Sequence, residues 1–271
     1  MKTTMKFLSL MLALLLICST LVACGKPTTF EVVTDAVNKT LALDSISATM
    51  EMTMDMEMAS LGTSVEVPMT TTIKASGLQS DAPVILTELT MSMMGIEMET
   101  VNYVEGEYMY MTMLGESYKV KMEDMTDYDG MNDIDNLIKA LPEALLSEIE
   151  ATENADGTKT VKVEVPNDML DTIYGELLAQ VQQSAAEGAT VDSCNITEAA
   201  VEITIDKDGY ISVYDMSFLM EMGMSVEGFS MDVSADVEAK VTYENPGEPV
   251  TVTPPEGYQD FPEANADEIG L

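Results

Sequence analysis

The sequence predicts an α+β domain built on one large curved antiparallel sheet, an open half-barrel, with helices packed on one face. Apolar and polar residues alternate without a break over 46–58 and 229–243, as they do on strands with one buried and one solvated face. Strands this long normally twist and coil, which predicts the curvature. At 29–43 and 134–149 apolar residues recur at helical spacing instead, and these segments predict the covering helices.

The first half of the chain is predicted to be one helix followed by a meander of strands. In the helix, 29–43, one apolar face runs from Phe30 to Leu41, and the period changes to two after Asp44. Breaks at Glu105-Gly106 and Gly115-Glu116 divide the later part of this region into short hairpins. Strands are therefore expected at 46–58, 65–73, 85–93, 96–104, 107–113 and 117–122.

A helical insert and three long strands are predicted for the second half. The helix at 134–149 contains Pro142, which kinks or splits it. After a strand at 158–165, Pro166 marks the start of a second helix, whose apolar face extends to Val181. The closing strands are expected at 199–205, 214–224 and 229–243, and residues 246–271 are predicted to be an acidic, proline-rich C-terminal tail.

The N-terminus has the pattern of a secretory signal. A basic start is followed by an apolar run from Phe7 to Cys18, and small residues precede Cys24. The word Leu21-Val22-Ala23-Cys24 resembles a bacterial lipobox. The resemblance implies a signal peptide over 1–23, a diacylglyceryl group on the thiol of Cys24 that carries acyl chains such as palmitate, and a short tether over 24–28, with Cys24 as the first mature residue. An ordinary signal peptide is the alternative, while the uncharged run is short for a transmembrane helix.

The charge balance excludes several classes of partner. The chain has 48 Asp and Glu residues and only 12 basic residues, all of them lysine, so its formal net charge is −36. There is no Arg, His or Trp. Nucleic-acid binding needs a basic footprint and is therefore excluded. Anionic lipid headgroups would repel so acidic a chain, so a lipid at Cys24 is the expected means of holding it at a cell membrane, on the extracytoplasmic face.

No catalytic residue, cofactor or metal site is predicted. Cys18 lies in the signal and Cys24 would be acylated, which leaves Cys194 without a disulfide partner and without a histidine to activate it. We interpret it as a half-buried structural cysteine. Acids cluster over 124–135, but their spacing is not that of a calcium-binding loop, so a solvated loop is expected there.

Methionine is unusually abundant, with 25 residues, and much of it alternates along predicted strands. It could simply fill the core; it could form an adaptable wall for an apolar ligand; or its thioethers could bind Cu(I). The residues assigned to such a ligand-binding wall are Met50, Met52, Met54, Met56, Met58, Met91, Met93, Met216, Phe218, Met220, Met222 and Met224.

The order of elements resembles the LolA-like and LppX-like lipoprotein superfamily, in particular its uncharacterised Gram-positive members. The similarity rests on the lipobox, on a helix ending in Thr40-Leu41-Ala42-Leu43-Asp44-Ser45, and on a central hairpin with Tyr108-Met109-Tyr110-Met111, Gly115 and Tyr118. It covers residues 29–245. The resemblance implies an open half-barrel whose concave apolar face accepts acyl chains, and it brings no catalytic signature.

These observations together predict a membrane-anchored extracytoplasmic lipoprotein that is not an enzyme. Its expected function is to bind a lipid or another apolar ligand in a methionine-lined half-barrel cavity. A methionine-rich Cu(I)-binding lipoprotein is one alternative, and a surface interaction module without a ligand is the other.

Overall fold

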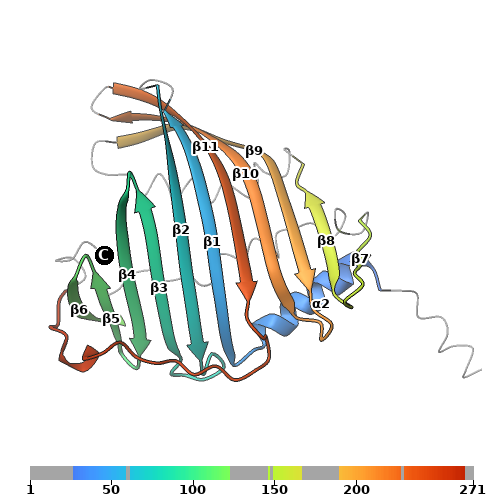
Figure 1. The fold of residues 1–271 in the computed structure, drawn as a ribbon, viewed down its shortest axis with the longest axis horizontal. Helices are drawn as coiled ribbons and strands as arrows, with labels where there is room; N and C mark the ends of the chain where they lie inside the picture. The colour runs from blue at the N-terminus through green and yellow to red at the C-terminus, as the bar shows by residue number, and fades with distance from the viewer. Residues whose placement is uncertain are drawn as a thin grey trace, which may run out of the picture.

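The structure is a computed structural model, and it describes residues 27–58, 62–122, 146, 149–166, 189–226 and 229–265. Cys24, the predicted signal peptide, the acidic stretch at 124–135 and the helix predicted after Pro166 lie outside the described residues. The same holds for nearly all of the helix predicted at 134–149, of which only its end is described. Within the described residues the chain forms one 11-stranded antiparallel sheet and one α-helix (Figure 1).

The sheet consists of two meanders joined side by side. In space its strands follow the order β6-β5-β4-β3-β2-β1-β11-β10-β9-β8-β7, so the first and last long strands pair with each other. The helix α2 spans Thr29–Leu41. The strands are β1 Ser45–Met58, β2 Thr63–Ser76, β3 Val84–Met93, β4 Ile96–Glu105, β5 Tyr108–Met113, β6 Glu116–Lys121, β7 Thr152–Glu153, β8 Lys159–Glu164, β9 Ala189–Ile205, β10 Ile211–Val226 and β11 Phe229–Tyr243.

The predicted fold class is wrong. The structure has the large antiparallel sheet, but in the described residues the fold is dominated by that sheet, with a single helix, and is not a mixed α+β domain with several helices packed on one face. The period-two pattern extends further than expected, because β9 has 17 residues and β10 has 16, so strands account for more of the chain. Of the three predicted helices, only that at 29–43 lies within the described residues, and it is present as α2.

Helix α2 is defined by its caps and fastened to the sheet by a buried threonine. At its start, the Thr28 hydroxyl accepts a hydrogen bond from the Glu31 N–H, and the Glu31 carboxylate accepts one from the Thr28 N–H, which completes a capping box. Near its end, the Thr40 hydroxyl donates to the Ala36 carbonyl at 2.8 Å and accepts from the Ile211 N–H at 2.9 Å. Thr40 therefore supplies the hydrogen-bond acceptor for the buried Ile211 N–H at the start of β10.

The hydrophobic core lies between α2 and one half of the sheet. Val33 and Val37 of α2 are buried against the inward-facing residues of β8–β11, which include Val161, Ile203 and Tyr214. Thr29 adds a hydrogen bond from its hydroxyl to the Ile149 carbonyl. This side of the sheet, which we call the inner face, is the one that also bears the methionines.

The C-terminal segment 246–265 runs back along the strand ends, past the start of β1 and the end of β4, to the far edge of the sheet at β6 (Figure 1). A short 3-10 turn, Tyr258–Asp260, places the Tyr258 ring edge-on to Tyr103 and Tyr110, with ring centroids 5.0 and 4.8 Å apart. The chain then pairs with β6, because the Lys119 N–H donates to the Pro262 carbonyl at 2.9 Å and the Lys119 carbonyl accepts from the Ala264 N–H at 3.0 Å. The outer edge of β6 is thereby covered over this stretch.

Replacing Thr40 tests the link between α2 and β10. Thr40→Val keeps the shape of the side chain but leaves the buried Ile211 N–H without its acceptor, so we expect the free energy of unfolding to fall by about 1–3 kcal/mol in urea titrations. Thr70→Val, on an exposed strand position, is the matched control and should change it by less than about 0.5 kcal/mol. Equal effects of the two substitutions would contradict this role for Thr40.

Candidate functional site

The methionines of five strands lie on the inner face because the strand register aligns them. Reading across the sheet, Met216 of β10 is opposite Ala239 of β11, which is opposite Met52 of β1. Met52 is opposite Met69 of β2, Met69 is opposite Met91 of β3, and Met91 is opposite Met98 of β4. Directly opposed residues have Cβ atoms about 4.5–5.5 Å apart, so these side chains form a continuous row. We call the six residues from Met216 to Met98 the methionine row.

The structure places the residues assigned to the wall at inner-face register positions of β1, β3 and β10. The five methionines of β1 are half-buried, while Met93 at the end of β3 is 40% exposed. For Met224 only the backbone position is described, opposite Met231. Close to α2, Met50, Met216, Phe218 and Met220 pack against the buried core and contribute to folding.

Several inner-face methionines were missing from the sequence assignment. Met69 and Met98 complete the methionine row, and Met109 and Met111 of β5 are buried on the same face. The sequence placed these residues on strands but did not show which face each strand turns inward. The two-residue turns at Met94-Gly95 and Gly106-Glu107 set the register of Met98 and of Met109 and Met111, so these turns were the available signal.

One polar side chain is noteworthy on this apolar face. Asn102 of β4 lies between Thr87 of β3 and Met111 of β5. Its amide oxygen is buried, and it has no hydrogen-bond partner among the residues that the structure describes. A buried acceptor without a partner is costly, so a ligand group that donates a hydrogen bond would be favoured at this position.

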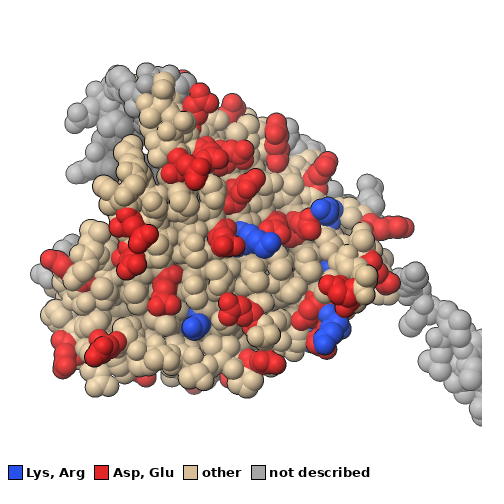
Figure 2. Space-filling view, viewed as in Figure 1, with Lys and Arg blue, Asp and Glu red and all other residues tan. Residues whose placement is uncertain are grey.

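The opposite, outer face is polar and strongly acidic. Figure 2 shows this face, with acidic side chains spread over the whole sheet and few lysines among them. The strand residues concerned are Glu51, Asp55, Glu57, Glu66, Glu88, Glu97, Glu99, Glu202, Asp215, Glu221, Asp232, Asp236 and Glu238, with Lys74, Lys162 and Lys240 among the lysines. The sheet is therefore two-sided, with thioethers on one face and carboxylates on the other.

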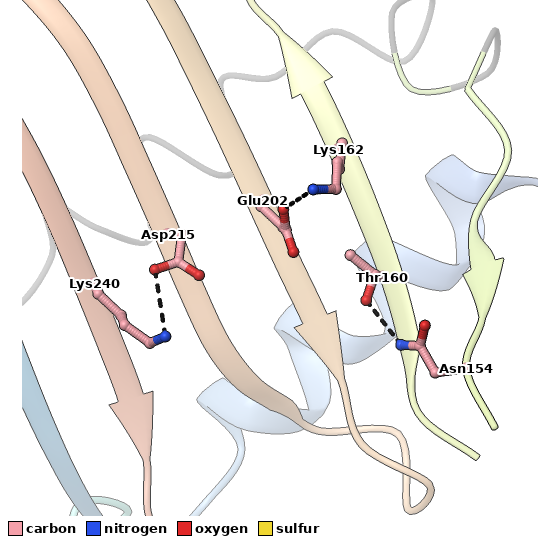
Figure 3. A network of polar contacts seen from close by, with 6 residues as sticks. All are labelled: Asn154, Thr160, Lys162, Glu202, Asp215 and Lys240. Carbon is pink, nitrogen blue, oxygen red and sulfur yellow. Dashed lines mark hydrogen bonds and ion pairs between the residues drawn. The ribbon is translucent and has the colours of Figure 1, made fainter. Parts of the chain in front are cut away.

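A groove of about 500 Å³ runs across the outer face where β1, β11, β10, β9 and β8 lie side by side. Lys162 pairs with Glu202 at 2.5 Å, and Lys240 lies 3.9 Å from Asp215 (Figure 3). These side chains are substantially solvent-exposed, and ion pairs of this kind contribute little stability. Asn154 joins β8 from the β7 side through a 2.9 Å hydrogen bond to the Thr160 hydroxyl. The groove is a polar surface, and the methionine row lies on the other side of the sheet.

The candidate nucleophile within the described residues is the thiol of Cys194. Cys194 is a partly buried free cysteine opposite Met222 on the inner face. Burial raises the pKa of its thiol, which disfavours the reactive thiolate. In the described ranges, no three His, Cys, Asp or Glu side chains are close enough to hold a metal ion, and no helix is long and apolar enough to cross a membrane.

The raised pKa of Cys194 predicts slow thiol chemistry. At about pH 8, near the ordinary pKa of a free thiol, Cys194 should react with Ellman's reagent well below the rate of glutathione, because less of it is thiolate and access is limited. Adding urea should restore a normal rate. A native protein that reacts as fast as glutathione would contradict the structural interpretation of this residue.

Comparison with known proteins gives the following similarities. The crystal structure of LprF from Mycobacterium bovis is similar with a TM-score of 0.42 and 14% identity, covering 86% of this chain and 100% of LprF. A DUF1329 family protein from Desulfovibrio piger is similar with a TM-score of 0.21 and 9% identity, covering 80% of this chain and 90% of the other. No curated protein matches significantly. The family model of DUF6612 matches residues 28–256, and the chain therefore belongs to this family of unknown function.

Proposed function

We propose that this protein is an extracytoplasmic lipoprotein, anchored in the cell membrane through a diacylglyceryl group on the thiol of Cys24, that binds a lipid or another apolar ligand on its inner face and has no enzymatic activity. The observation that supports this most is the methionine row, which continues the apolar surface from the core beneath α2 to β4 at the far side of the sheet. The resemblance to LolA-like and LppX-like lipoproteins points to the same class of ligand.

Methionine suits a surface that must fit chains of different shape. Its side chain is unbranched, flexible and polarisable, and it adapts to irregular apolar partners. Each methylene of an acyl chain contributes about 0.8 kcal/mol when it leaves water, before the entropy lost on binding is subtracted. An acyl chain that lies along Met52, Met69 and Met91 would remove several of its methylene groups from water, and this burial would provide the binding free energy. Asn102 could then accept a hydrogen bond from a hydroxyl or amide near the headgroup.

A second candidate function is Cu(I) binding. Met52, Met69 and Met91 are directly opposed on three neighbouring strands, so their thioethers could approach a single ion. Thioethers are ligands that Cu(I) accepts. The chain has no histidine to strengthen such a site, which places this function second.

The anchor is tested by replacing the predicted acylation site. Cys24→Ser should move the protein from the membrane fraction to the soluble fraction, because serine has no thiol to receive the diacylglyceryl group. Metabolic labelling with palmitate should disappear in parallel. Cys194→Ser is the matched control and should leave both labelling and membrane fractionation unchanged; soluble, unlabelled wild-type protein would contradict the lipoprotein proposal.

The ligand is tested by native mass spectrometry on three forms of the protein. The wild type should carry a co-purifying lipid. Replacing Met52, Met69 and Met91 together by leucine should retain it, because apolarity and volume are nearly kept, whereas replacing them by glutamine should remove it.

The same variants separate lipid from copper. In a Cu(I) competition titration, a thioether site would be lost in both the leucine and the glutamine variant. If the glutamine triple variant does not fold, Met69→Gln alone is the fallback, with circular dichroism as the check. Tight Cu(I) binding in the wild type that both variants abolish, with no lipid in any form, would overturn the lipid proposal in favour of the metal.

A further inference from the structure

Two neighbouring hairpin turns expose large apolar side chains to solvent. The exposed large hydrophobic residues of the described chain all lie at these turns: Met93 is 40% exposed, Met94 74%, Ile96 66%, Met113 40% and Leu114 72%. One turn joins β3 to β4 and the other joins β5 to β6. Because β4 pairs with β5, with Thr100 opposite Met113, the turns lie at the same end of adjacent hairpins. We call residues 93–96 and 113–115 the apolar tips.

Turn formation does not explain the residues at the apolar tips. Met94 has φ +52° and Leu114 has φ +53°, and each is followed by a glycine with φ of about +80°. Two-residue hairpin turns with two positive φ values favour Asn, Asp or Gly at the first position, because other side chains are strained there. Met94 and Leu114 therefore carry two costs, a strained backbone conformation and an apolar side chain exposed to solvent. Such an arrangement indicates that the side chains have a partner outside the chain.

We propose that the apolar tips insert into the surface of the lipid bilayer to which the protein is anchored. The inference rests on the lipid at Cys24 from the proposed function, which lies just before the described residues. A tether over 24–28 can span at most about 17 Å, so the bilayer is the apolar partner held closest to the domain. The charged neighbours of the tips are Glu97, Glu99 and Glu116, and these would repel an anionic partner. The contact is therefore apolar and suited to a neutral or zwitterionic lipid surface.

The positions of anchor and tips define how the domain lies. The start of α2 lies beside β7 and β8 at one lateral edge of the sheet, and the apolar tips lie toward the opposite edge (Figure 1). Both can therefore reach one bilayer only if the sheet lies along the membrane. The acidic outer face (Figure 2) would then turn away from the headgroups and the methionine row toward them. Met93 and Ile96 are opposite each other on the inner face, directly beyond the pair Met91 and Met98. The tips thus continue the apolar surface to the membrane, where an acyl chain would enter.

Insertion can be measured directly because the chain has no tryptophan. Met94→Trp or Leu114→Trp introduces a single indole fluorophore at one tip, and Thr70→Trp on the outer face is the matched control. The full-length lipidated protein is reconstituted into phosphatidylcholine vesicles with brominated acyl chains. We expect blue-shifted, quenched emission from both tip variants and solvent-like emission from the control. Replacing part of the phosphatidylcholine by phosphatidylglycerol should weaken quenching at low salt.

A second pair of substitutions separates folding from membrane contact. Met94→Asn with Leu114→Asn puts the preferred residue at each turn, so stability in urea should be equal to or above that of the wild type. In the Cys24→Ser background, vesicle sedimentation of this variant should be at least about tenfold weaker, because two large apolar side chains are lost.

The outcomes distinguish this inference from the proposed function. Vesicle-bound protein whose tip variants stay solvent-like would overturn insertion and leave the anchor intact. Tip fluorescence that is shielded without vesicles, and that changes with protein concentration, would overturn it in favour of a second copy as the partner. Quenched tips together with an absence of any co-purifying lipid would support insertion and contradict the ligand proposal.

Discussion

The pairing of β1 with β11 is the constraint on which the rest of the structure depends. It joins strands separated by most of the chain, in unbroken register from Ala48 opposite Tyr243 to Met58 opposite Val233. Without it, the two meanders would be separate sheets with unsatisfied edges. With it, the core beneath α2 and the methionine row share one face. Contacts this distant in sequence close late and slowly, so the inner face is complete only when the whole sheet has assembled.

The strands could be predicted from the sequence because each carries its own period-two pattern. The run from Ile46 to Met58 shows both faces of β1 without any knowledge of its neighbours. Register is a different matter, since it depends on which residues two strands bring together. That Met69 and Met98 join Met52 and Met91 follows from pairing and turn geometry, which single-strand patterns do not contain. The same limit applies to the predicted α+β class, because the pattern did not show how far β9 and β10 extend.

The sequence predicted the chemical character of the candidate site, but it did not show where in the fold the site lies. Methionine abundance suggested an adaptable apolar surface, and the absence of histidine and arginine excluded most alternatives. Two features needed the structure. Asn102 is unremarkable in the sequence, and only once β3, β4 and β5 are placed together does its amide oxygen emerge as buried with no hydrogen-bond partner among the described residues. The apolar tips likewise became evident through exposure and positive φ at Met94 and Leu114, properties that no residue pattern reports.

The coverage of β6 by the C-terminal segment affects how copies of this protein can associate through their sheet edges. A free outer strand offers its backbone to any neighbour with another free outer strand, and such pairing propagates into fibres. Here one border of the sheet is already occupied by the chain around Glu263, and the other ends in β7, a strand of two residues that includes Glu153. Over these two stretches the sheet offers little free backbone to another sheet. Pairing between copies of the protein is therefore disfavoured at these two places.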